Sequence, residues 1–482
     1  MLIPIGFNDL LCKMNEQINQ IQNKKPRILV CGIGSKHFRD DYLELLNQHY
    51  LAPILVAGTE LESRVNYASK QLQKAGIRDV KIIPIKPFGK DSRICKEDEN
   101  KLNNLVEQED INGVIIITEA IAHLPYLKWA VQKGIPCLVE KPLTSYNGIV
   151  QDSDKAKQII RDYDYLKDVI KDRGSFVSIV SQRRWNKAFL FIKDKIEEVY
   201  NRYGTPVSLL RGMKNKGDWM KPSHLLTKEN HPYKYGYGVL SHTGYHPVDI
   251  MDFTVSKISK DLGINRIEVF AQMSYPKDVY VGTKHADIFE DNIENLNVCG
   301  LGECSVNGVY SYSKDNTKVL LASLQISNNG LCQKDFSQPE GHIWDRTTGT
   351  IRQEAYTWTQ GPFQEIDFEL YQDKTGTHES LYEYGGDNYG LVTIKRNGKL
   401  QNVEKISIEN FEVEDERAAE ACLKEAILEF IERVNGNKIT PRSDLEQHEI
   451  PIKIESGLYQ SAIKNLPISL TIGERNCNDK KS

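Results

Sequence analysis

GIPCLVEKP, residues 134–142, is the stretch that decides the fold of this chain. Its apolar part is short and rich in β-formers, and it ends in Glu140, Lys141 and Pro142. This pattern is typical of a buried strand that delivers an acid and an amine to the edge of a sheet. Ligands bind beyond the carboxyl ends of the strands in open parallel sheets. We therefore expect Lys141 to stand at a ligand site.

The surrounding sequence predicts more strands of the same kind, separated by helices such as His123 to Lys133. Gly113 to Thr118 is a continuous β-branched run, as expected of a parallel strand that is covered on both faces. Alternating strands and helices predict a doubly wound parallel sheet of the Rossmann type. The other strands are expected at Arg27 to Cys31, Pro53 to Ala57, Val80 to Ile85 and Phe176 to Ser181.

Beyond about residue 204 the pattern changes to alternating strand-like runs, which predict a large, open and mainly antiparallel sheet in a C-terminal α+β domain. Helices are expected at residues 415–434 and 456–464. The predicted organisation is a helical extension over 1–25, a dinucleotide-binding domain over 26–185, a substrate and oligomerisation domain over 186–465 and a tail over 466–482.

Composition narrows the function classes. The chain has 40% hydrophobic and 27% charged residues and a formal net charge of −4, which gives no footprint for nucleic acid or for an anionic membrane. No apolar stretch is long enough to cross a bilayer, and no signal peptide is recognisable. The nine cysteines are scattered, so we expect reduced thiols. These features predict a cytoplasmic protein with a small-molecule substrate.

A Gly-x-Gly motif follows the first strand directly. Gly32 and Gly34, with Ser35, would let backbone N–H groups approach a pyrophosphate at a helix N-terminus. The third position of the full fingerprint is His37 instead of glycine, and a plain βα turn remains the alternative. At the end of the second strand we find Thr59 instead of an acid, with Arg64 further on, so NADP is at least as favoured as NAD.

With this Gly-x-Gly, with His123 and with Gly244-Tyr245-His246-Pro247-Val248-Asp249, the Glu140-Lys141-Pro142 motif resembles the Gfo/Idh/MocA oxidoreductase family, from about residue 26 to about residue 465. The resemblance implies catalytic roles for Lys141, His246 and Asp249. It implies assembly into a homodimer or homotetramer. Two departures from the family pattern are His242, where an acid is common, and the sequence Thr118-Glu119-Ala120, where an amide is usual.

The chemistry of these residue types agrees with the resemblance. A histidine, which titrates near neutral pH, can take the hydroxyl proton of a secondary alcohol as hydride leaves, and His246 is the candidate. Lys141 can stabilise the developing alkoxide, and Asp249 can orient the imidazole from one helical turn away. A metal site on His242, His246 and Asp249 is disfavoured, because Pro247 interrupts a regular helix through both histidines.

The sequence thus predicts an NAD(P)-dependent oxidoreductase that acts on a sugar-like or cyclitol-like metabolite. Two alternatives stay open: a redox-neutral enzyme that uses its nicotinamide transiently, and a nucleotide-sensing regulator without catalysis. The residues expected to bind substrate are Arg184, Trp185 and His242. The residues expected to bind the cofactor are Gly32, Gly34, Ser35, Thr59, Arg64, Thr118, His123, Glu140 and Lys141.

Overall fold

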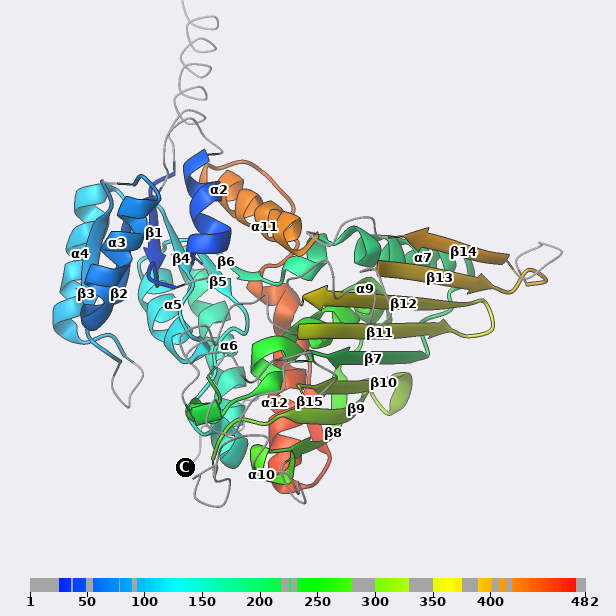
Figure 1. The fold of residues 1–482 in the computed structure, drawn as a ribbon. Coiled ribbons are helices and arrows are strands. Elements are labelled where there is room, and N and C mark those ends of the chain that lie inside the picture. Colours follow the sequence, from blue (N-terminus) through cyan, green and yellow to red (C-terminus); the bar gives the residue numbers. More distant parts are fainter. Residues whose placement is uncertain are drawn as a thin grey trace, which may run out of the picture. The chain divides into compact units, whose positions relative to one another are not determined.

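Figure 1 shows the computed structural model of the chain. The structure describes residues 26–35, 38–48, 55–77, 79–88, 93–217, 225–226, 232–279, 300–328, 350–374, 389–400, 407–412 and 418–473. The predicted extension over 1–25 lies outside these residues, as does His37. The chain forms two compact units. The first comprises Met1–Glu140, Leu166–Val180 and Glu420–Leu445, and the second comprises Lys141–Tyr165, Ser181–Ala419 and Glu446–Ser482.

The first unit contains the predicted doubly wound sheet. Six parallel strands follow the order β3-β2-β1-β4-β5-β6, so the strand order reverses between β1 and β4. The ligand-binding crevice of such sheets lies at this reversal. The strands are β1 (Ile28–Cys31), β2 (Leu55–Leu61), β3 (Lys81–Ile85), β4 (Gly113–Ile116), β5 (Cys137–Glu140) and β6 (Val177–Val180).

The helices of this unit connect its strands in the expected alternation (Figure 1). α5 (His123–Gln132) is the crossover between β4 and β5, close to the predicted span. Its apolar residues are buried on nearly every side, which suits a helix that lies against a sheet. The others are α2 (Leu43–Gln48), α3 (Val65–Lys74), α4 (Lys96–Glu109) and α6 (Ser153–Arg173), the last of which runs into both units.

A late helix returns to the first unit, which departs from the predicted boundary at residue 185. α11 (Ala418–Val434) contributes Leu423, Ile427, Phe430 and Ile431 to the same buried core as β1 and α2. Gly113 of β4 leaves space mainly for Ile28 of β1, because a Cβ there would lie 2.6 Å from Ile28 Cδ1; Val434 Cγ2 of α11 would be 3.3 Å away. Amphipathic spacing predicted the helix but not the surface that it covers.

The second unit is built on the predicted, mainly antiparallel sheet. Its nine strands follow the order β14-β13-β12-β11-β7-β10-β9-β8-β15, and β7 and β10 form the parallel pair. The strands are β7 (Leu209–Asn215), β8 (Arg266–Ser274), β9 (Ser305–Lys314), β10 (Thr317–Ser327), β11 (Thr350–Gln360), β12 (Gln364–Lys374), β13 (Tyr389–Arg396), β14 (Ser407–Glu412) and β15 (Ile468–Thr471). β15 extends the sheet beyond the boundary predicted at residue 465.

Helices α9 (Tyr245–Leu262) and α12 (Glu449–Lys464) pack against this sheet, and α7 (Lys187–Tyr203) packs against α9. Glycines let them approach: a Cβ at Gly212 would lie 2.5 Å from Met251 Sδ, and one at Gly308 would lie 2.5 Å from Leu458 Cδ2. α12 begins seven residues before the predicted start at 456. No described helix is both long and apolar enough to cross a membrane.

Candidate active site

The Gly-x-Gly turn closes tightly over the end of β1. Gly32 has a φ of +93°, and a Cβ there would lie 2.9 Å from the carbonyl oxygen of Ile117, so only glycine fits without strain. The N–H groups of Gly32 and Ile33 both donate to the Thr59 carbonyl of β2, at 3.0 and 3.2 Å. The turn therefore has the close backbone geometry that a nucleotide-binding loop requires.

The structure corrects the expectation that β2 ends without an acid. β2 continues to Leu61, four residues past the predicted end, and Glu60 lies within it. The Glu60 carboxylate accepts hydrogen bonds from Gly34 N–H at 2.7 Å and from its own neighbour Leu61 N–H at 2.9 Å. Glu60 is therefore the acid at the end of the second strand, beside the glycine turn.

Thr59, which the sequence analysis placed at the cofactor, points the other way because successive strand residues face opposite sides of a sheet. Its hydroxyl is fully buried and lies 3.0 Å from the Tyr126 hydroxyl. Arg64 donates to the Gly34 carbonyl at 2.9 Å, and the Ser35 hydroxyl accepts the Phe38 N–H at 3.0 Å. Arg64 and Ser35 thus brace the turn, and their cofactor contacts remain predictions.

The ends of β4 and β5 carry the other predicted cofactor residues of the first unit. His123 is buried, and its Nε2 lies 2.9 Å from the Thr118 carbonyl, so this ring holds the turn after β4. Glu140, the last residue of β5, accepts a hydrogen bond from the Tyr42 hydroxyl at 2.5 Å. The structure thus shows that His123 contacts the turn after β4 and that Glu140 is buried. Direct contacts of these residues with a nucleotide remain predictions.

In the second unit, Lys141 is brought to the segment that carries the predicted catalytic histidine. Its ammonium donates to the His242 carbonyl, in the π-helical turn Leu240–Gly244. Pro247, five residues after His242, has no N–H to serve as the π-helical donor to this carbonyl. α9 then begins at Tyr245, so that Pro247 falls in its first turn beside His246.

The two histidines of this segment have different surroundings. The ring of His242 is buried and packs edge-on against the rings of Tyr233 and Tyr237, with centroids 5.1 and 5.0 Å away. His246 is 7% exposed at the second position of α9. These contacts test neither proton transfer by His246 nor substrate binding by His242, so both roles remain predictions.

Asp249 is held by Arg184 and not by the expected His246. The Arg184 guanidinium donates to both carboxylate oxygens, with Nε–Oδ2 at 3.0 Å and Nη2–Oδ1 at 2.6 Å, and the Ser181 hydroxyl donates as well. Both members of the pair are at most 1% exposed. A bidentate, charge-assisted pair is a stronger partner than an imidazole, so it takes the carboxylate. Arg184, predicted to bind substrate, is thus part of an internal ion pair, next to the buried Trp185.

Sequence reasoning missed His448, which completes this cluster. Its Nδ1 lies 3.1 Å from Asp249 Oδ1 and 2.9 Å from the Tyr245 hydroxyl, and its ring stacks on that of Tyr245. Burial disfavours the charged form of Asp249, but Arg184 and His448 outweigh it and hold the pKa of this carboxyl well below its usual range. No spacing signal links residue 448 to residue 249.

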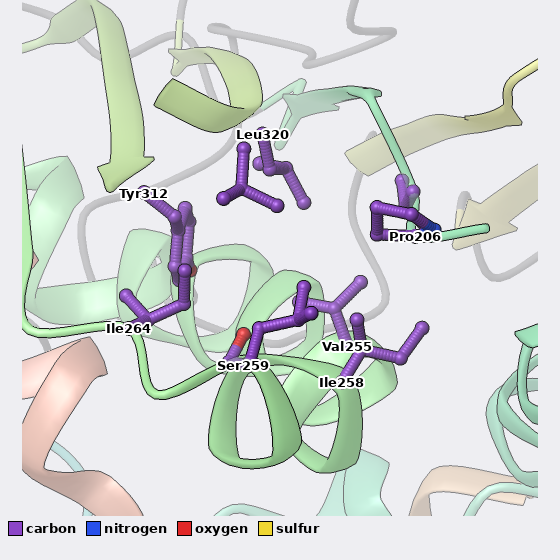
Figure 2. Close-up of a pocket in the computed structure, with 10 residues that line it drawn as sticks. Pro206, Val255, Ile258, Ser259, Ile264, Tyr312 and Leu320 are labelled. Carbon is purple, nitrogen blue, oxygen red and sulfur yellow. The ribbon is translucent and has the colours of Figure 1, made fainter. Parts of the chain in front are cut away.

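A small hollow, with room for about one water molecule, lies between α9 and the sheet (Figure 2). Its lining is almost wholly apolar, and Figure 2 shows Val255, Ile258 and Ile264 around it with the Ser259 hydroxyl as a rare polar atom. None of the predicted site residues lines it. We assign no chemistry to it, since it lacks the convergent polar groups of a binding site.

Known proteins resemble this chain in their three-dimensional structures but not detectably in their sequences. Neither the models of protein families nor the curated protein sequences that were searched match the chain. Among solved structures, an aldose-aldose oxidoreductase from Caulobacter crescentus in complex with glycerol has a TM-score of 0.54 at 12% identity, covering 93% of this chain and 100% of its own.

Two further structures are similar over most of their length. An oxidoreductase from Agrobacterium radiobacter, in complex with NAD+, L-tartaric acid and magnesium, has a TM-score of 0.56 at 11% identity, covering 92% and 98% of the two chains. Myo-inositol 2-dehydrogenase from Lactobacillus plantarum has a TM-score of 0.53 at 14% identity, covering 92% and 99%. These likenesses confirm the predicted resemblance in fold to oxidoreductases of the Gfo/Idh/MocA type.

Proposed function

We propose that the chain is an NAD-dependent oxidoreductase that moves hydride between the nicotinamide and a hydroxyl-bearing or carbonyl carbon of a sugar-like or cyclitol-like metabolite. The observation that carries the proposal is the glycine turn with Glu60 beneath it. A Cβ at Gly34 would lie 2.2 Å from Glu60 Oε2, so the turn accepts only glycine while the acid is in place. Such an acid accepts hydrogen bonds from ribose hydroxyls in dinucleotide sites.

The second unit supplies the groups for proton transfer. Bound nicotinamide would supply the hydride acceptor or donor. Lys141 would donate to the substrate oxygen and stabilise its negative charge as the hydroxyl proton leaves. His246 would take that proton at its imidazole. The Lys141 ammonium is already oriented by the His242 carbonyl. The lysine side chain would therefore lose less conformational entropy when substrate binds.

The similar solved structures support the substrate class. One is a myo-inositol 2-dehydrogenase, another is an aldose-aldose oxidoreductase, and a third was crystallised with NAD+ and L-tartaric acid. All three names or ligands point to polyhydroxylated small molecules. Because the sequence identities are 11–14%, this class enters as part of the proposal.

The first test is nucleotide binding followed by turnover. We expect purified protein to quench or shift NADH fluorescence, to melt at a higher temperature with NAD+, and to reduce NAD+ with at least one member of a panel of cyclitols, aldoses and polyols. Ligand binding to the folded state alone raises the melting temperature. A protein that responds to neither NAD(H) nor NADP(H) would refute the proposal.

Glu60 makes a sharper test, because its charge should select the nucleotide. Replacing it by glutamine keeps the shape but removes the charge that repels a 2′-phosphate. We expect Glu60→Gln to weaken NAD+ binding by about tenfold to a hundredfold, the loss of one charge-assisted hydrogen bond, and to shift the NAD+/NADP+ preference toward NADP+. The exposed Glu62 provides the matched control, Glu62→Gln. Unchanged dissociation constants for both nucleotides in Glu60→Gln would argue against this role.

A further inference from the structure

Four buried polar side chains of the second unit form one hydrogen-bonded group, which we call the carboxyl network: Ser241, Glu303, Glu455 and Tyr459. The Ser241 hydroxyl donates to Glu455 Oε1 at 2.9 Å and lies 2.9 Å from the Tyr459 hydroxyl. The Tyr459 hydroxyl donates to Glu303 Oε1 at 3.2 Å. All four are at most 1% exposed, so the network joins two carboxyl groups away from water.

The network retains a proton near neutral pH. Burial raises the pKa of Glu303 to about 7 and that of Glu455 to about 8, and the negative charge of Glu303 adds to the rise at Glu455. Glu303 Oε1 accepts the Leu240 N–H at 2.7 Å. The backbone N–H groups of Leu240, Glu303 and Gly238 lower the pKa of this carboxyl group, but the effect of burial is larger.

The network also forms hydrogen bonds with the turn Leu240–Gly244, which orients Lys141. Glu303 holds the N–H of Leu240 and Glu455 holds the hydroxyl of Ser241. The next residue, His242, gives its carbonyl to the Lys141 ammonium. The charge of Lys141 lowers the pKa of Glu455, so an ionised Glu455 must in turn favour the charged form of Lys141. Geometry and electrostatics therefore connect the network to the same amine.

Among the residues that the structure describes, few other charges reach the network. Tyr245 of α9 faces Glu455, and Tyr275 and Cys304 face Glu303, but burial raises the pKa of each, so they are neutral near pH 7. Asp278 of α10 (Pro276–Val279) acts on Tyr275 and Cys304. Within the described ranges, Lys141 is thus the cation that lowers the pKa of Glu455.

We propose that the carboxyl network is a positioning element for Lys141, because it fixes the turn whose His242 carbonyl accepts a hydrogen bond from the amine. Release of the network's proton at alkaline pH would then strengthen the hold on the charged amine. The inference rests on the proposed function, because Lys141 is the group that it serves there. The Ser241, Glu303, Glu455 and Tyr459 side chains touch the turn and not the reacting atoms, so they position and do not catalyse.

The test measures the reactivity of Lys141 and needs no substrate. Native protein and Glu455→Gln are labelled briefly with acetic anhydride across a pH series, and the Lys141 peptide is quantified by mass spectrometry. Removing the carboxyl group should lower the pH of half-maximal labelling by about one unit. Labelling should rise by about twofold at pH 8, where about half of Glu455 is still protonated, and by about fivefold at pH 9. Glu268→Gln on β8, where the acid pairs with Lys318 at the surface, is the matched control and should label as native protein does.

Two further measurements keep the inference falsifiable. Native protein should show the infrared band of a protonated carboxylic acid at neutral pH, and Glu303→Gln and Glu455→Gln should each weaken it. If Glu455→Gln fails to fold, Ser241→Ala cuts the link to Glu455 while keeping both carboxyl groups, and Lys141 labelling should be several times faster than in native protein. Labelling equal to the Glu268→Gln control, or absence of the infrared band, overturns the inference.

Turnover separates this inference from the proposed function. If native protein binds no nucleotide and oxidises no substrate, the proposed function fails, while the labelling result still decides whether the network positions Lys141. If turnover is found, Glu455→Gln should lower kcat with little change in KM, and the alkaline limb of its pH–rate profile should move. A purely structural loss would lower activity at every pH alike.

Discussion

Lys141→Met is expected to lower kcat for the proposed oxidation by about a hundredfold to ten-thousandfold while leaving NAD+ affinity within about threefold. Methionine keeps the length and apolar body of the side chain but has no donor and no charge. The loss follows because the alkoxide would no longer be stabilised by an ammonium, which acts mainly in the transition state. Steady-state kinetics, with NAD+ binding measured separately by calorimetry, would resolve the two effects.

The matched control is Lys257→Met on α9. Lys257 pairs with Asp261 and Asn201 at the surface, so its loss should change neither kcat nor nucleotide affinity. Retention of native kcat in Lys141→Met would remove this amine from the mechanism. A drop in NAD+ affinity as large as the drop in kcat would instead place Lys141 in nucleotide binding.

The parallel sheet of the first unit was predictable because buried β-branched runs alternate with amphipathic helices at βαβ spacing. The run ending at Glu140 is β5, and the strongest predicted run, from Gly113, is β4. The large second sheet was predictable in kind from alternating patterns. These are local signals, and each requires only a dozen neighbouring residues.

The parts of the site that the sequence concealed depend on strand register and on contacts between distant segments. Extending β2 from residue 57 to Leu61 brings Glu60 into the strand, and strand alternation turns Glu60 to the glycine turn and Thr59 to the core. Strand ends are the least certain part of a sequence-based assignment. The packing of α11 on the first unit could not be predicted either. The sequence shows that one face of the helix is apolar, but it does not show which surface that face contacts.

The cluster around Asp249 shows the same limit for chemistry. Spacing places Asp249 one turn from His246, and this predicted that the two would interact. The structure gives the carboxylate to Arg184, 65 positions earlier, and to His448, far later in the chain. Their geometry gives Asp249 a structural role as the partner of a buried guanidinium, while its catalytic role remains a prediction. The structural role has a consequence that can be measured.

Asp249→Asn is expected to lower the free energy of unfolding by about 3–5 kcal/mol, because it leaves the Arg184 guanidinium buried without its carboxylate. Arg184 has 1% of its side chain exposed, so solvent cannot replace the lost partner. Replacing both residues with apolar ones, as in Arg184→Met with Asp249→Leu, should recover part of the loss, since no unpaired charge then remains. Urea unfolding of the single and double variants gives the coupling energy.

The pH dependence of stability distinguishes this pair from an ordinary surface contact. Because the pKa of Asp249 is depressed in the folded state, its stabilising contribution is present above the unfolded pKa of about 4 and is lost as the pH falls through the folded value. Native protein should therefore lose more stability than Asp249→Asn between pH 5 and pH 3, by an amount of order 1 kcal/mol or more. If folded Asp249→Asn instead kept native stability and lost all turnover, Asp249 would be restored to the catalytic role that its spacing from His246 suggested.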